Sequence, residues 1–203
     1  MTISLQESIT DGSLNDVIDD IIKEDKDYTI FNDDIMYQIT TSNNQKIIKN
    51  NISTVDIRDC EQILKEIYDI EESIPLIIFK RDYFNPETLI PLIGYEVYHP
   101  LNKSKLDLSY CNNSVSLNIP VTINEDKIYQ YDPNSDYYND ECSSYTSDNG
   151  TDILLFDRKK EYNENNLSLC EVNCDYQGYD KTYKQSTCDC NIKKNIEYIS
   201  NIL

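Results

Sequence analysis

The sequence predicts a mainly β, α+β fold: a β-sandwich-like domain with two amphipathic helices, followed by a small disulfide-rich module. Three observations predict it. Short apolar or alternating runs separated by polar turns recur through residues 1–123, as in strands. Only two segments in that region, near residues 13–25 and 60–68, space their apolar residues as helices do. The cysteines cluster near the C-terminal end, where residues 170–190 hold four of them.

The first part of the predicted domain begins with a helix over residues 13–25. Its aliphatic residues recur every three or four positions, and Asp11 or Ser13 can cap its N-terminus. Residues 28–31 and 35–40 are β-rich runs separated by three polar residues, which predicts two strands joined by a turn. Residues 52–57 predict a further strand.

The second part of the predicted domain begins with a helix that opens at Asp59 and carries apolar residues on one face through residue 68. The apolar run 73–79, which has Pro75 near its start and Lys80 after its end, predicts a buried strand. Alternating patterns at 92–98 and 115–121 predict two more strands. Many strands and few helices favour a sandwich for residues 1–123.

Residues 124–150 are acidic, rich in tyrosine and without hydrophobic periodicity, which predicts a linker or a long surface loop. Within them, oxygen-bearing side chains occupy positions 1, 3, 5 and 9 of a calcium-loop pattern; these are Asp132, Asn134, Asp136 and Asp140. Tyr137 stands where the pattern needs glycine, and Ser143 where it needs a bidentate glutamate. The four residues are therefore weak calcium candidates, and no cofactor is expected.

Residues 151–203 are expected to form the cysteine-rich module. Residues 151–156 predict a strand, 157–162 a charged turn or short helix, 167–174 a helix capped by Asn165 or Asn166, and 175–190 a hairpin. On such elements Cys170 and Cys174 share one helix face, and Cys188 and Cys190 share one strand face. Two disulfides could join the pairs. Alternatively, one four-cysteine zinc site could do so, in an intracellular zinc-binding scaffold, although C-x-C is tight for two ligands on one metal.

Residues 166–190 resemble the cystine-stabilised α/β scaffold of scorpion toxins and defensins, in which a helical C-x3-C is bonded to C-x-C on the last strand. The resemblance implies the pairs Cys170–Cys188 and Cys174–Cys190; the nested pairing stays open, and the scaffold's third disulfide is absent. Elsewhere, Cys60 and Cys111 are expected to form a bridge that closes a loop of about 50 residues. Cys142 is the odd cysteine and is expected to pair outside this chain segment or with a neighbouring chain.

A broader resemblance covers most of residues 50–203. The stretches SDYYNDECSSYTSDNGTDILLFDRKKEY and NLSLCEVNCDYQGYDKTYKQSTCDCNIK resemble cysteine-rich extracellular regions of large membrane proteins from protists with Asn-rich proteomes. The resemblance implies an adhesive or receptor-like ectodomain that continues into further cysteines and membrane spans. We therefore expect this chain to be part of a longer protein, with its last module truncated.

Signals of location in the sequence conflict. Residues 1–10 lack the features of a secretory signal, and no apolar run is long enough to span a membrane, which alone would indicate a cytosolic protein. Glycosylation sequons begin at five asparagines, namely Asn51, Asn102, Asn112, Asn149 and Asn166. Together with the clustered cysteines, the sequons favour the cell surface or extracellular space, reached through the secretory pathway.

The net charge and the lack of catalytic motifs limit the functions that the sequence supports. A formal net charge of −19 disfavours nucleic acid and anionic lipid as partners. No serine-hydrolase, zinc-protease or phosphate-loop motif is present, and the single histidine, His99, precedes a proline and is interpreted as a surface or capping residue. We expect a non-catalytic structural or recognition ectodomain of a membrane-anchored or secreted protein, without a cofactor, whose partner is a protein or another cell-surface ligand.

Overall fold

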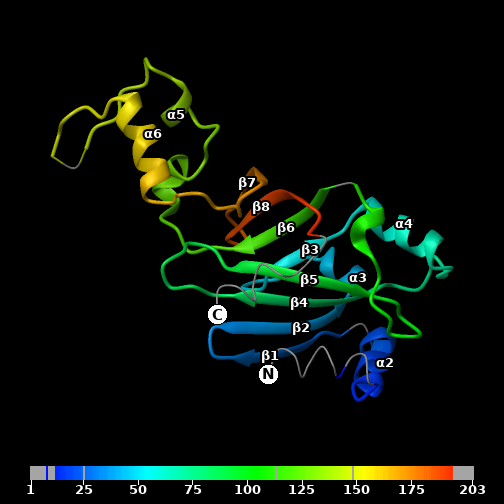
Figure 1. The fold of residues 1–203 in the computed structure, drawn as a ribbon. Coiled ribbons are helices and arrows are strands. Elements are labelled where there is room, and N and C mark those ends of the chain that lie inside the picture. The colour runs from blue at the N-terminus through cyan, green and yellow to red at the C-terminus, as the bar shows by residue number, and fades with distance from the viewer. Residues whose placement is uncertain (1–7, 9–11, 25, 113, 148, 194–203) are drawn as a thin grey trace.

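The computed structural model describes residues 8, 12–24, 26–112, 114–147 and 149–193. Two four-stranded antiparallel sheets lie face to face, one helix covers the outer face of the first sheet, and a small lobe stands off one side (Figure 1). The mainly β, α+β prediction is confirmed.

The first sheet has the strand order β1-β2-β4-β5. Its strands are β1 (Tyr28–Asn32), β2 (Ile35–Thr41), β4 (Ile77–Tyr83) and β5 (Leu92–Tyr98). Helix α2 (Asn15–Glu24) is amphipathic and lays Ile18 and Ile21 on the outer face of this sheet, against Tyr37, Ile39 and Phe79 among others. The strand expected at 73–79 begins later and continues through Lys80, Arg81 and Asp82, so the charged residues lie inside the sheet.

The second sheet has the strand order β3-β6-β8-β7. Its strands are β3 (Thr54–Asp56), β6 (Ser114–Pro120), β7 (Cys174–Asp180) and β8 (Gln185–Asn191). Between the two sheets, apolar side chains such as Val55, Leu117 and Cys188 meet Ile78 and Val97 in one cluster. Helix α4 (Asp59–Ile67) contributes Cys60 and Leu64 to the same cluster, and two short elements, α3 (Ser42–Gln45) and η1 (Leu108–Tyr110), complete the connections.

The cysteine-rich segment does not form a separate module after the sandwich. Strand β8 pairs with β6 over seven residues, from Ser114–Asn191 to Pro120–Gln185, and β7 then adds to β8 at the edge of the sheet. The helix expected at 167–174 is absent. The helix of this segment is α6 (Leu155–Glu164), which agrees with the short helix expected as one alternative at 157–162 and replaces the end of the strand expected at 151–156. Residues 151–193 therefore contribute half of the second sheet.

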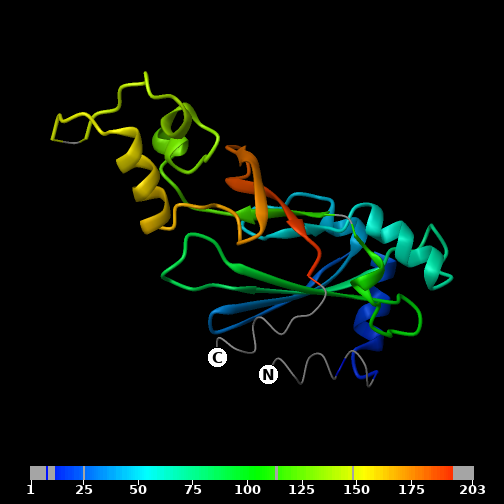
Figure 2. The ribbon, with the colours of Figure 1, turned by 45° about the horizontal axis from the view of Figure 1, so that its top comes forward.

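The stretch expected to be a linker forms most of the lobe, which we define as residues 124–165. The lobe contains η2 (Glu125–Gln130), α5 (Asp136–Asn139) and α6, and it projects from the chain between β6 and β7 (Figure 2). Arg158 lies at its centre: its guanidinium donates hydrogen bonds to the carbonyl oxygens of Ile153, Tyr137 and Ser143, at 3.1, 2.8 and 3.2 Å. The same group lies 5.3 and 5.0 Å from the ring centres of Tyr137 and Tyr145, so the lobe has a core of its own.

Candidate functional site

Three disulfides cross-link helix α4 and the second sheet. Cys60–Cys111 connects α4 to the segment before β6, and Cys170–Cys188 and Cys174–Cys190 connect the β7 segment to β8. These are the bridges expected from the sequence, including the two pairs implied by the toxin-like resemblance. The four C-terminal sulfurs are therefore bonded in two pairs, which leaves none of them as a thiolate for the alternative zinc site.

Other predicted residues take surface or turn positions. All five sequon asparagines are exposed, and Cys142 is exposed and unpaired. Asp132 and Asp140 hold backbone turns, since their carboxylates accept hydrogen bonds from the amides of Asn134 and Cys142, each at 2.8 Å. The part of the chain that the structure describes contains no group of three or more His, Cys, Asp or Glu side chains placed to hold a metal.

His99 closes a turn from the inside. It is only 8% exposed, and its Nδ1 accepts hydrogen bonds from the amides of Leu101 and Asn102, at 3.1 and 3.4 Å. Burial lowers the pKa of His99, which keeps the ring neutral and able to accept these bonds. The capping interpretation is therefore confirmed, and the surface interpretation is wrong.

A groove of about 400 Å³ lies at the end of the sandwich where β4 turns into β5. We call it the loop-end groove. Its walls come from the β4–β5 connection, from the end of β6, from the β7–β8 turn and from Asn51; the residues are Asn51, Phe84, Asn85, Thr88, Leu89, Ile90, Pro91, Pro120, Val121, Thr122 and Lys184. Phe84 and Leu89 stay 39% and 37% exposed in it, and Lys184 is the one charged residue among these.

A second hollow, of about 540 Å³, runs beside α4 but is chemically different. Charged side chains of both signs line it, with carboxylates in excess. Glu61 accepts hydrogen bonds from Lys46 and Ser42 and forms an ion pair with Lys65 at 2.9 Å. Ligand sites usually combine apolar walls with few polar groups. The loop-end groove fits that description and the hollow beside α4 does not.

The turn that carries Asn51 into the groove is held on both sides. Lys49 and Ile52 form an antiparallel bridge, and Asn51 between them adopts a left-handed φ of 60°, which asparagine tolerates better than most residues. Gln185, buried at the start of β8, donates its side-chain amide to the carbonyl oxygens of Lys49 and Ile52, at 2.6 and 3.1 Å. The turn is therefore fixed against the second sheet.

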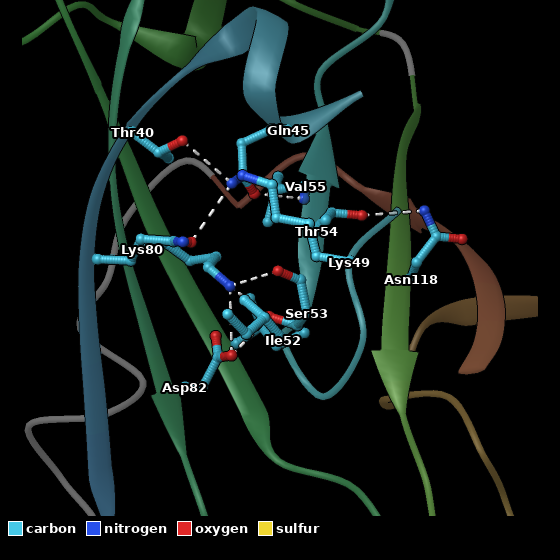
Figure 3. A network of polar contacts seen from close by, with 12 residues as sticks. Thr40, Gln45, Lys49, Ile52, Ser53, Thr54, Val55, Lys80, Asp82 and Asn118 are labelled. Atoms are coloured by element: carbon cyan, nitrogen blue, oxygen red, sulfur yellow. Dashed lines mark hydrogen bonds and ion pairs between the residues drawn. The ribbon is translucent and has the colours of Figure 1, made fainter. Parts of the chain in front are cut away.

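Directly after this turn, Ser53 enters a buried polar cluster of three residues, shown in Figure 3. Its hydroxyl donates to Asp82 at 2.6 Å, and Lys80 Nζ donates to the carbonyl oxygen and the hydroxyl of Ser53 at 2.5 and 2.6 Å. Lys80 and Asp82 also form an ion pair at 3.2 Å, and all three residues are 0% exposed. Burial lowers the pKa of Lys80. This cluster ties the Asn51 turn to the first sheet.

Serine, lysine and aspartate in contact are also groups that serve nucleophilic catalysis. Here none of the three exposes surface, so a substrate has no access to them, and the cluster is interpreted as the support of the groove wall. The cluster is not predicted from the sequence, because the predicted strand ends at Phe79, before the charged run at residues 80–82. The available signal was the alternation of Ile78, Lys80 and Asp82, which places all three on one face.

A search for membrane-spanning helices and the comparisons with known proteins add little information about function. Among the residues that the structure describes, no helix has the length and apolar character needed to cross a membrane. No protein-family model, curated protein or solved structure matches this chain.

Proposed function

We propose that this chain is a non-catalytic recognition ectodomain, extracellular or lumenal, of a secreted or membrane-anchored protein. The observation that carries the proposal is the bonding of six of the seven cysteines in three disulfides, which cross-link α4 and the strands of the second sheet. Such bonds form and persist in oxidising compartments and are rare in the cytosol. The exposure of all five sequon asparagines supports the same location.

The loop-end groove is the proposed contact surface. Its apolar walls suit an apolar group, and Lys184 at its rim suits one anionic substituent on that group, because no acidic side chain lines the groove to repel it. The buried Ser53–Lys80–Asp82 cluster and Gln185 hold one wall in place. A wall fixed in advance loses little conformational entropy when a ligand binds.

The experiment is intact mass spectrometry after thiol alkylation, on protein secreted from a eukaryotic host, with and without reduction and glycan removal. The proposal expects the six cysteines of the three disulfides to be protected from alkylation before reduction, all seven cysteines to be alkylated after it, and glycan on the secreted chain. Alkylation of all seven cysteines without reduction, with one zinc per chain in the native mass, would overturn the ectodomain in favour of an intracellular scaffold.

A further inference from the structure

The Asn51 sequon is divided between the surface and the core. Asn51 is exposed and lines the loop-end groove, whereas Ser53, which supplies the hydroxyl of the sequon, is 0% exposed and bonded to Lys80 and Asp82. The sequon at Asn149 differs, because both Asn149 and Thr151 are exposed at the tip of a turn. The two sites therefore offer an external enzyme very different access in the folded protein.

This difference makes modification of Asn51 depend on the order of folding. Glycan transfer requires the sequon to enter an enzyme active site as a flexible chain with its hydroxyl free. The residues that bury Ser53 lie 27 and 29 positions further along the chain, so the sequon stays free until β4 has been made and has joined the sheet. After that, modification of Asn51 would require the turn at Lys49–Ile52 and the buried cluster to open.

We propose that Asn51 is glycosylated on the nascent chain and that the first sugars of its glycan then lie in the loop-end groove. The proposal rests on the proposed function, because it needs the secretory pathway. Asn51 is itself a lining residue, so a sugar attached to its amide starts inside the groove. The C–H face of that sugar and its N-acetyl methyl group can cover Phe84 and Leu89, which otherwise leave apolar surface exposed.

Regulation of the groove follows from this placement. A chain modified at Asn51 has its groove covered, and a chain that folded before modification has it open. The fraction of open chains is set during synthesis, because the folded protein protects the sequon. Because open and covered chains do not interconvert, the amount of groove ligand that a preparation binds scales with its open fraction, while the affinity of each open chain is unchanged.

The first test is glycopeptide mapping of the protein from a secretory eukaryotic host, with and without a short pulse of dithiothreitol during synthesis. The reductant delays the Cys60–Cys111 bridge and hence folding. We expect occupancy at Asn51 to rise with the delay, while occupancy at Asn149 stays constant. Equal responses at both sites, or occupancy at Asn51 that does not change, would overturn the folding-order argument.

The second test uses the fluorescent probe 8-anilinonaphthalene-1-sulfonate, which joins an apolar body to one anionic group. Asn51→Gly removes the sequon and keeps the left-handed turn, since glycine adopts positive φ without strain. If about one wild-type chain in ten is open, this variant binds about ten times as much probe per chain as wild type at saturation, with the same dissociation constant. Asn102→Gln, which removes a sequon away from the groove, is the matched control and is expected to leave binding unchanged.

Two further variants show that the probe reports on the groove. Adding Leu89→Ser or Lys184→Gln to Asn51→Gly is expected to weaken probe binding, because each removes one part of the groove surface. If Asn51→Gly and wild type bind equal amounts of probe per chain although mapping shows glycan on wild-type Asn51, the proposal that the glycan covers the groove is wrong. Glycan at the other sequons but none at Asn51 would overturn the inference and leave the ectodomain standing. Seven free thiols and no glycan would overturn both.

Discussion

Replacement of Lys80 by methionine tests whether the buried cluster supports the fold. Lys80 Nζ makes three polar contacts, with the carbonyl oxygen and hydroxyl of Ser53 and with Asp82. Methionine keeps much of the volume and removes all three. Asp82 then remains as a buried carboxylate with one hydrogen bond, from Ser53, because its Oδ1 has no partner in the described structure. Breaking a buried ion pair in this way costs about 3–5 kcal/mol of unfolding free energy.

The assay is urea unfolding with the disulfides intact, followed by circular dichroism and extrapolated linearly to water. The double variant Lys80→Met with Asp82→Leu removes the stranded charge and is expected to be more stable than Lys80→Met by about 2 kcal/mol. Lys160→Met is the control, because its ion pair with Glu164 is exposed and 3.7 Å long, and no measurable change is expected. A cost below about 1 kcal/mol for Lys80→Met would refute the reasoning.

Three other predictions concern acid stability, the lobe and the free thiol. Burial raises the pKa of Glu61, but hydrogen bonds from two lysines and Ser42 outweigh burial and hold this pKa below its usual 4.5. The stability that the ionised Glu61 contributes is therefore lost as pH falls below that value. Glu61→Gln should flatten this loss in an acid titration followed by circular dichroism. Arg158→Met should make the lobe sensitive to limited proteolysis while the sandwich stays resistant. The control Lys159→Met changes an exposed neighbour and should leave the lobe resistant. Equal cleavage of the lobe in both variants would contradict the role of Arg158. Cys142→Ser should abolish disulfide-linked species on non-reducing gels, and linked species that persist in this variant would place the intermolecular bond elsewhere.

Periodicity in the sequence predicted the parts of the fold in which each element buries one regular face. The helices expected at 13–25 and 60–68 are α2 and α4, shifted by at most two residues at each end, because their aliphatic spacing is dictated by packing on the sheets. The matched spacing of C-x3-C and C-x-C indicated that these cysteines could be joined, but which cysteine pairs with which was implied only by the resemblance to the toxin and defensin scaffold. Their structural setting was not predictable: β8 pairs with β6, whose partner residues lie 65 to 77 positions earlier in the chain, and no local pattern specifies that partner.

The candidate site was less predictable than the fold. Lys80 is a buried strand residue only because Ser53 and Asp82 satisfy its charge, and neither the pairing of Ser53 with β4 nor its burial can be read from neighbours in sequence. The structure of the lobe was not predicted for a similar reason. Its tyrosines follow neither a helical nor a strand period, and Arg158 gathers them from separate segments of chain.

The positions of the disulfides bear on how the protein would carry mechanical load. If Cys142 is joined to another molecule, tension enters through the lobe and leaves along two segments of chain. One segment reaches Cys170, whose bond to Cys188 passes the tension to β8 without loading the hydrogen bonds between β7 and β8. The other passes through β6 to Cys111 and the bond to Cys60. Tension in both directions therefore meets a covalent cross-link at the second sheet.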